Sequence, residues 1–340
     1  MSESRLSRRD FVKVGAAGAA GVALQGGGQA AAAASSGQAP PMPERPLGRT
    51  GHNVRLFSLG GQATIEQPNR EEDSMAIVNR AIDLGVNYVD TAAAYGRNPD
   101  GPPYSQTYIG KVMKDRRNEV FLASKTHDRS RDGSLRLLEQ SLELLNTDHL
   151  DLWQLHNIST TRQLDQIFAD DGAIHAMVEA REQGMVRFLG ITGHADPDVL
   201  LDGINRFDFD TILMALNPAD PHYLPFMENL LPAVNRKGMG VIAMKIPARG
   251  RIFREGGITG ISQAMTWVLS QPVSTCIIGC DDVAQLEENV AVARDFKPLN
   301  SMEMRRIEGL VADYPQEASF FKRGAAGFGR GMVDDQQFVD

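Results

Sequence analysis

Hydrophobic and polar residues follow two alternating patterns between residues 55 and 293. Short apolar runs, typical of buried β-strands, are separated by longer segments in which apolar residues recur every three or four positions. Leu135, Leu138, Leu142 and Leu145 form one such series, which places a single apolar stripe on an amphipathic helix. The pattern therefore predicts strands and helices in alternation.

Eight strand–helix pairs are present in this pattern. The expected strands cover residues 55–60, 87–90, 120–125, 150–156, 188–192, 211–217, 241–245 and 276–279. The expected helices cover residues 70–84, 106–113, 134–145, 174–183, 197–204, 225–236, 261–269 and 283–293. Helical crossovers of this length join parallel strands, and eight such units close into a barrel. We therefore predict an α/β fold, a single-domain (β/α)8 TIM barrel, over residues 44–323.

Length and charge agree with one globular barrel. A chain of 340 residues could form two domains of about 150 residues, but β/α barrels commonly use about 250 residues as one domain. No GxGxxG follows the first expected strand, which disfavours the doubly wound dinucleotide fold. The net charge of -8, without a basic cluster outside the N-terminus, argues against a nucleic-acid partner. No apolar run approaches the ~18 residues of a membrane span, so we expect none in the mature chain.

The segment 1–34 differs in character from the rest of the chain. Arg8 and Arg9 precede Phe11, and a weakly apolar Ala/Gly/Val stretch then leads to a run of small residues at 30–34. This order resembles a twin-arginine export signal, with a disordered tail as the alternative. The resemblance implies passage through the twin-arginine export machinery, cleavage near residue 34, and a periplasmic or extracellular location.

Two short segments flank the predicted barrel. Residues 35–43, rich in Ser, Gln and Pro, are expected to form a linker. Residues 324–340 contain four glycines and no periodic pattern. We expect this last segment to be a tail or a loop over the barrel mouth.

Cys276 and Cys280 are the only cysteines, and they lie at the end of an apolar run. An extended backbone would hold their Cα atoms about 13 Å apart, beyond the ~7 Å limit for a disulfide. We therefore expect two free thiols. No matching histidine spacing accompanies them and no HExxH pair is present, so we predict no metal site.

Four chemically active residues fall at or just past the ends of successive expected strands. Asp90 ends the second strand, and Tyr95 follows it in the sequence DTAAAYG. Lys125 ends the third strand in FLASK, and His156 ends the fourth in LDLWQLH. Because the carboxyl ends of all strands share one face of a β/α barrel, we expect these four side chains to meet there.

These residue types suit acid catalysis at a carbonyl group. Hydride delivery to the carbon leaves negative charge on oxygen, so a proton donor is needed within about 3 Å. A lysine ammonium about 4 Å from a tyrosine favours the phenolate by roughly 4 kcal/mol, which would move the pKa of Tyr95 towards neutrality. Asp90 can orient Lys125, and a neutral His156 can donate an N–H to the carbonyl oxygen. Each residue alone has an ordinary structural explanation, so the indication lies in the order of all four.

This order of strand-end motifs resembles the aldo-keto reductase superfamily. The resemblance covers about residues 44–295 and implies an enzyme that reduces carbonyls or oxidises alcohols with NAD(H) or NADP(H). It implies that the four residues form the catalytic tetrad and that a hairpin at 45–51 closes the barrel floor. The segments QGMVRFLGIT at 183–192 and DDVAQLEEN at 281–289 are similar to the family's fifth strand and cofactor-binding helix.

The same resemblance implies a cofactor site at the later strand ends and at the start of the last helix. The residues concerned are Thr192, Asn217, Lys245, Gly279, Asp281, Gln285, Glu288 and Asn289. Glu288 and Asn289 would face the adenine, near a helix N-terminus that favours anions. Asp281 stands where relatives that bind a 2′-phosphate usually place a cation, which favours NAD(H). Arg249 or Arg251 could still reach that phosphate.

Three features of the family pattern are missing, and all concern the nicotinamide ring. Thr192 and Gly193 replace a serine–asparagine pair, Leu213 replaces a glutamine, and Met244 replaces an aromatic residue. The loop at 97–103 is an insertion beside the proposed acid. It is either a surface feature or a lid that shapes the substrate pocket.

We therefore predict an exported oxidoreductase that transfers a hydride between a nicotinamide cofactor and a small carbonyl or alcohol, with Tyr95 as general acid. A nicotinamide-binding sensor with negligible turnover is the alternative that the lost ring contacts favour. A barrel glycosidase would need two carboxylates at strand ends, and Asp90 is assigned elsewhere. Substrate identity does not follow from the sequence, because the pocket walls come from variable loops.

Overall fold

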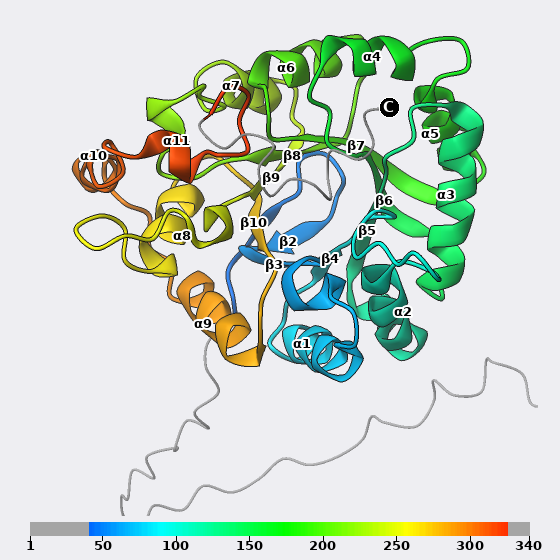
Figure 1. Ribbon diagram of the computed structural model, residues 1–340, viewed down its shortest axis with the longest axis horizontal. Helices are drawn as coiled ribbons and strands as arrows, with labels where there is room; N and C mark the ends of the chain where they lie inside the picture. The colour runs from blue at the N-terminus through cyan, green and yellow to red at the C-terminus, as the bar shows by residue number, and fades with distance from the viewer. Residues whose placement is uncertain (1–40, 326–340) are drawn as a thin grey trace, which may run out of the picture. The chain divides into compact units, whose positions relative to one another are not determined.

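The computed structural model describes residues 41–325, which form a closed β/α barrel (Figure 1). Its eight parallel strands are β3 (Phe57–Gly60), β4 (Tyr88–Asp90), β5 (Phe121–Thr126), β6 (Leu150–Leu155), β7 (Val186–Gly193), β8 (Thr211–Ala215), β9 (Gly240–Met244) and β10 (Thr275–Ile278). Each strand pairs with the next along the chain, and β10 pairs with β3 to close the barrel. The predicted (β/α)8 fold is confirmed.

Helices surround the strands (Figure 1). They are α1 (Glu71–Asp83), α2 (Tyr104–Arg116), α3 (Arg131–Leu144), α4 (Thr161–Ile167), α5 (Ala173–Glu182), α6 (Pro197–Arg206), α7 (Leu230–Arg236), α8 (Ile261–Leu269), α9 (Val283–Arg294), α10 (Ser301–Gly309) and α11 (Pro315–Ala318). Short 3-10 turns are η1 (Ala63–Glu66), η2 (Arg117–Glu119), η3 (Asp220–His222) and η4 (Ala248–Gly250). The apolar stripes of the helices pack on the outer faces of the strands in one core.

The predicted strands agree with the observed ones to within two residues at each end, and Arg55 belongs instead to a separate hairpin strand. Seven predicted helices agree to within three residues, and the helix predicted at 225–236 begins only at Leu230. The cause is Asp220, whose carboxylate accepts hydrogen bonds from the backbone N–H groups of Phe226 (3.1 Å) and Met227 (2.9 Å). These bonds hold the residues before α7 in a turn.

Three observed helices, α4, α10 and α11, have no counterpart among the predicted elements. A capping box of Thr160 and Gln163 starts α4, and one of Asn300 and Glu303 starts α10. Such boxes are sequence signals for a helix N-terminus. With seven residues α4 is too short for an apolar period to show, and α10 buries only Ile307.

The barrel interior is apolar and closed from below. The inner cluster contains Tyr88, Phe121, Ala123, Leu152, Leu213, Ile242 and Ile277. The hairpin of β1 (Glu44–Pro46) and β2 (Asn53–Arg55) adds Leu47 and Val54, both fully buried, at the floor. The predicted floor hairpin is confirmed and extends beyond 45–51 at both ends.

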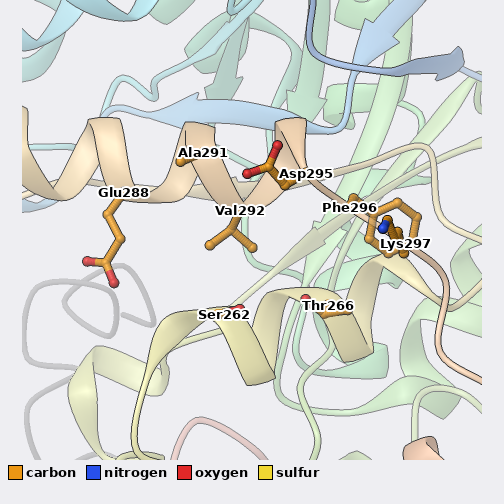
Figure 2. A pocket seen from close by; sticks show the side chains of 8 residues that line it. All are labelled: Ser262, Thr266, Glu288, Ala291, Val292, Asp295, Phe296 and Lys297. Carbon is orange, nitrogen blue, oxygen red and sulfur yellow. The ribbon is translucent and has the colours of Figure 1, made fainter. Parts of the chain in front are cut away.

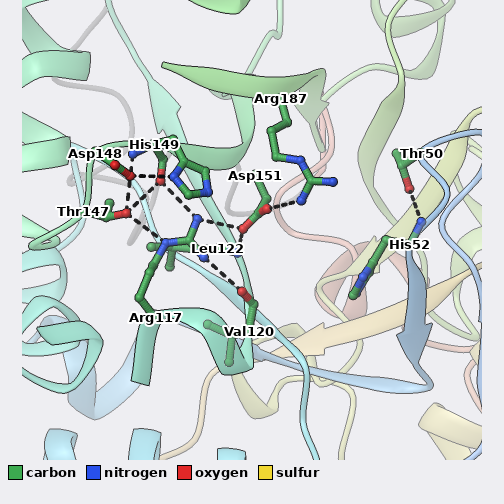
Figure 3. Close-up of polar contacts among 10 residues, drawn as sticks. All are labelled: Thr50, His52, Arg117, Val120, Leu122, Thr147, Asp148, His149, Asp151 and Arg187. Atoms are coloured by element: carbon green, nitrogen blue, oxygen red, sulfur yellow. Dashed lines mark hydrogen bonds and ion pairs between the residues drawn. The ribbon is translucent and has the colours of Figure 1, made fainter. Parts of the chain in front are cut away.

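A polar network joins β5, β6 and β7 at the floor end (Figure 3). The carboxylate of Asp151, at the start of β6, accepts a hydrogen bond from the Leu122 N–H (2.9 Å) and pairs with Arg117 (2.8 Å) and Arg187 (2.6 Å). Burial alone would raise the pKa of Asp151, but the Leu122 hydrogen bond and the two arginines outweigh burial and lower that pKa. The buried Asp151 carboxylate therefore links β5, β6 and β7 and fixes their alignment.

The segment after α11 packs across the opposite, mouth end of the barrel. Lys322 and Asp220 form a fully buried ion pair at 2.6 Å, and Arg323 pairs with Asp196 at 2.6 Å. Asp196 follows β7 and Asp220 follows β8. The C-terminal part of the described chain is therefore fixed to the loops after both strands.

Cys276 and Cys280 are buried free thiols, as predicted, and burial raises the pKa of each to about 12. Between residues 41 and 325, no helix has both the length and the apolar character needed to cross a membrane. The predicted signal at 1–34, most of the linker and nearly all of the tail lie outside the described residues.

Candidate active site

The ends of β4, β5 and β6 bring the four predicted catalytic residues together. In the barrel register Asp90 pairs with Ala123 of β5, and Lys125 pairs with Gln154 of β6. The exposed fractions are 3 % for Asp90, 9 % for Tyr95, 1 % for Lys125 and 6 % for His156. Four chemically active side chains are thus almost fully buried at one barrel mouth.

Lys125 is the centre of the cluster. Its ammonium forms an ion pair with the Asp90 carboxylate and donates to the backbone oxygen of Thr91 at 2.8 Å. It also donates to the phenol oxygen of Tyr95 at 3.2 Å and lies 4.5 Å from the centroid of that ring. A buried ammonium in contact with a phenol favours ionisation of the phenol.

Asp90 divides its carboxylate oxygens between two partners. Lys125 binds Oδ2, and the side-chain amide of Gln154 donates to Oδ1 at 3.1 Å. Burial raises the pKa of Asp90, and Lys125 and Gln154 oppose that effect. Gln154 is a member of the site that the sequence pattern did not indicate, because a glutamine within an apolar strand carries no spacing signal.

A tight turn presents Tyr95 to the cluster. Gly96 has a φ of +72°, and a Cβ at this position would lie 2.5 Å from the backbone oxygen of Glu66, so only glycine fits. The Tyr95 ring meets the His156 ring edge-on, with centroids 5.4 Å apart and an interplanar angle of 79°. The acid and the second donor predicted from the sequence therefore lie side by side.

The backbone around His156 is held by the neighbouring strand ends. The His156 N–H donates to the Thr126 oxygen at 2.9 Å, and its own carbonyl accepts from the Arg129 guanidinium at 2.7 Å. The Asn157 N–H donates to the hydroxyl oxygen of Thr192 at 2.8 Å. Arg129 is a second residue of the site without a signal in the sequence, because it lies in a loop outside any motif.

The predicted cofactor residues at the end of β7 and just after β8 and β9 lie at the same mouth. The Asn217 amide nitrogen donates to the oxygens of Lys245 (3.2 Å) and Ala318 (2.9 Å), and its oxygen accepts from the Ala219 N–H (2.9 Å). Thr192 already accepts the hydrogen bond described above. Both side chains therefore bind the protein's own backbone, and Lys245 stands in a left-handed turn with φ 64°.

Two of the residues that depart from the family pattern, Leu213 and Met244, have apolar surroundings in the structure. Leu213 is 2 % exposed in the inner cluster, and Met244 packs against that cluster. The mouth between β8 and β9 thus lacks the polar side chain and the aromatic ring that the resemblance implied.

The predicted adenosine site lies where β10 leads into α9. Asp282 caps α9 by accepting from the Gln285 N–H at 2.8 Å, and the Gln285 side chain accepts from the Asp281 N–H at 2.8 Å. Asn289 is 1 % exposed, and its amide nitrogen contacts the Cys280 sulfur at 3.5 Å. Its amide oxygen is buried without a hydrogen-bond partner among residues 41–325. A buried, unsatisfied acceptor fits an amino group such as that of adenine.

Glu288 lies apart from this position. It is exposed and lines a groove between α8 and α9 with Ser262, Thr266 and Asp295 (Figure 2). The structure therefore brings Gly279, Asp281, Gln285 and Asn289 together at the barrel mouth but directs Glu288 between the outer helices. In the described part of the chain, no three His, Cys, Asp or Glu side chains are grouped to hold a metal ion.

The fold defines a β/α-barrel protein with a buried cluster of titratable side chains at its mouth. Residues 56–257 match the Aldo/keto reductase family, and the chain belongs to that family. It is 24% identical over 309 residues to the uncharacterized oxidoreductase YqkF of Bacillus subtilis, covering 78% of this chain and 96% of that protein. It is 27% identical over 295 residues to L-galactose dehydrogenase of Arabidopsis thaliana, and the match covers 75% of this chain and 89% of that protein.

A solved structure shows the same architecture. The holo form of aldo-keto reductase AKR11C1 from Bacillus halodurans superposes with a TM-score of 0.67 at 25% identity. The match covers 79% of this chain and 96% of that protein. The similarity therefore spans nearly the whole of the relative.

Proposed function

We propose that this protein transfers a hydride between a nicotinamide cofactor and a carbonyl or alcohol substrate, with Tyr95 as general acid and base. The observation that carries the proposal is the contact of the buried Lys125 ammonium with both Asp90 and Tyr95. Family membership supports redox chemistry, and one similar protein is named as a dehydrogenase.

In the direction of reduction, Tyr95 donates its phenolic proton to the carbonyl oxygen as that oxygen gains negative charge. Lys125, 3.2 Å from the phenol oxygen, stabilises the phenolate that remains. Asp90 holds Lys125 in place. His156, edge-on to Tyr95, donates a ring N–H to the same substrate oxygen. In the direction of oxidation, the phenolate accepts the proton of the alcohol.

A nicotinamide cofactor, when bound, supplies or accepts the hydride. Gly279, Asp281, Gln285 and Asn289 would hold its adenosine part, and the buried oxygen of Asn289 is the observation that fits this role. Thr192, Asn217 and Lys245 would line the nicotinamide part. Because the side chains of Thr192 and Asn217 are engaged with backbone, we expect backbone groups and apolar contact to dominate there.

The preferred cofactor is proposed to be NAD(H). Asp281 and Asp282 are exposed carboxylates at the start of α9, and a carboxylate repels a 2′-phosphate but accepts hydrogen bonds from ribose hydroxyls. Arg251 lies over the Phe320 ring at 4.1 Å, which gives that cation a partner within the protein. Isothermal titration should show tighter binding of NAD(H); NADPH binding tighter by about tenfold, or 1.4 kcal/mol, would contradict this preference.

One observation favours a second candidate, a nicotinamide-binding sensor with negligible turnover. The amide of Asn217 is bonded on both of its atoms to backbone, and Leu213 offers no polar group to the ring. The two candidates share the fold and the cofactor. They differ only in whether a bound carbonyl is reduced.

We also propose that the protein is exported through the twin-arginine route. The support is the order of Arg8, Arg9 and Phe11 before a weakly apolar stretch and small residues. A cofactor-binding barrel must fold before it binds its cofactor, and this route carries folded proteins.

A fluorescence titration of NADH and NADPH, followed by a panel of aldehydes and ketones, tests the proposed function. Binding followed by steady oxidation of the cofactor with at least one carbonyl is the expected result. Binding without turnover across the panel and the matching alcohols would favour the sensor.

A further inference from the structure

Three basic residues gather beside the catalytic cluster. Arg97 lies two residues after Tyr95, and His127 and Arg129 follow Lys125 in the next loop. Burial, together with the charges of Arg129 and Arg97, lowers the pKa of His127 to about 4. Arg97 lies in the loop after β4, and His127 and Arg129 lie in the loop after β5, so all three residues follow the strands that carry Asp90 and Lys125.

Arg129 is the basic residue in direct contact with the catalytic backbone. Its Nη2 donates to the carbonyl oxygens of His156 at 2.7 Å and Asn157 at 3.4 Å. Its Nη1 is buried and has no hydrogen-bond partner among the described residues. Burial lowers the pKa of Arg129 only to about 10, so the guanidinium remains charged at neutral pH. A buried charged donor without an acceptor is costly to maintain.

Asp128, the residue before Arg129 in the chain, does not accept a hydrogen bond from this donor and is engaged elsewhere. Asp128 accepts hydrogen bonds from the N–H and hydroxyl of Ser130, at 2.8 and 2.7 Å, next to the start of α3. Its charge raises the pKa of Arg129 by less than burial lowers it. The Arg129 guanidinium therefore keeps its positive charge, and its Nη1 has no hydrogen-bond acceptor among the described residues.

We propose that Arg129 binds an anionic group of the substrate, a carboxylate or a phosphate separate from the reacting carbonyl. Guanidinium N–H groups form strong, directional hydrogen bonds to such oxygens. The substrate class is then a small aldehyde, ketone or alcohol that carries a second, negatively charged group. This inference rests on the proposed function and adds specificity to it; Arg129 selects the substrate and takes no part in proton transfer.

The test compares matched charged and neutral aldehydes. One pair is 4-carboxybenzaldehyde and its methyl ester, and the other is glycolaldehyde phosphate and glycolaldehyde, which separates a carboxylate from a phosphate requirement. Wild-type protein should prefer the charged member of at least one pair by about tenfold or more in kcat/KM. Arg129→Gln should lower kcat/KM for the charged member of the pair by about tenfold more than for its neutral partner, and Arg129→Lys should keep part of the preference.

Arg136→Gln is the matched control, because it removes the same charge from an exposed position on α3. It should leave the preference unchanged. Equal rates for both members of each pair in the wild type, or an equal loss on charged and neutral substrates in Arg129→Gln, would overturn the inference and assign Arg129 to holding His156.

A binding measurement separates this inference from the proposed function. Calorimetric titration with benzoate and benzamide needs no turnover. Benzoate should bind the wild type more tightly than benzamide, and Arg129→Gln should abolish the difference while its thermal melt stays cooperative. If no carbonyl reacts but the wild type still binds benzoate more tightly than benzamide, the proposed enzymatic function is rejected and the anion site is kept. If the wild type binds benzoate and benzamide equally, the anion site itself is rejected.

Discussion

Gln154 and Lys125 bind different oxygens of one buried carboxylate, so the position of Asp90 depends on both. Gln154→Leu would leave Oδ1 of Asp90 buried without a donor, which typically costs about 1–3 kcal/mol. We expect Asp90 to hold Lys125 less well, with kcat lower by about tenfold, KM little changed and the pH profile of kcat displaced. Steady-state kinetics across pH checks this. An unchanged kcat and profile would mean that Gln154 only fills space.

Among the residues of the site, those that belong to a sequence motif could be predicted, and those outside any motif could not. Asp90, Tyr95, Lys125 and His156 could be predicted because each follows an apolar run in the order of the family. Their convergence requires only a barrel, which the strand–helix pattern supplies. Gln154 and Arg129 could not be predicted, because their contacts depend on strand register and loop path.

Among the structural elements, the floor network makes a pH-dependent contribution. The folded-state pKa of Asp151 is lowered below its unfolded value of about 3.9, so its stabilisation is full above that value and is lost as pH falls through the folded pKa. Asp151→Asn leaves the partly buried Arg117 without its charge partner and should lower the free energy of unfolding by about 1–3 kcal/mol at pH 7.

Urea unfolding at several pH values measures this contribution. The difference between wild type and Asp151→Asn should be constant near neutrality and narrow below about pH 4. Asp148→Asn is the control, because that carboxylate is exposed and its pairing with His149 is screened by water. If the difference in unfolding free energy between wild type and Asp151→Asn grew on acidification, the stabilising role of the ionised Asp151 would be contradicted.

Element boundaries followed local signals where these were strong. Strands were predictable because buried apolar runs are continuous in a parallel sheet. The late start of α7 was not, because it depends on the Asp220 carboxylate binding the backbone of Phe226 and Met227. For α4 and α10 the sequence does carry a local signal, the capping boxes Thr160–Gln163 and Asn300–Glu303 at the two helix starts.

On the scale of the whole molecule, the barrel was predictable from eight repeated units, whereas the packing of the C-terminal segment was not. Lys322 is buried against Asp220 in a contact between residues far apart in the chain. Nothing in the local pattern around Lys322 distinguishes it from a solvated lysine. The part of the mouth covered by this segment therefore became visible only in the structure.

Export is a second property of the whole molecule. Replacing Arg8 and Arg9 by Lys should leave the full-length precursor in the cytoplasm, because the arginine pair is the feature that resembles the export signal. Cell fractionation with blotting for precursor and mature forms checks this, with the wild-type chain as the reference. Wild-type protein that stays uncleaved and wholly cytoplasmic in its native cell would reject the proposal.

The central claim is that Tyr95 is the proton donor at a working redox site, and Tyr95→Phe tests it most directly. The change removes one hydroxyl and little volume, so the reduced cofactor should bind as in the wild type by fluorescence titration. Single-turnover reduction of a carbonyl substrate should slow by about 10²–10⁴-fold, the usual contribution of a general acid. A phenylalanine variant that keeps more than about half of the wild-type rate, with chemistry limiting, would contradict the account.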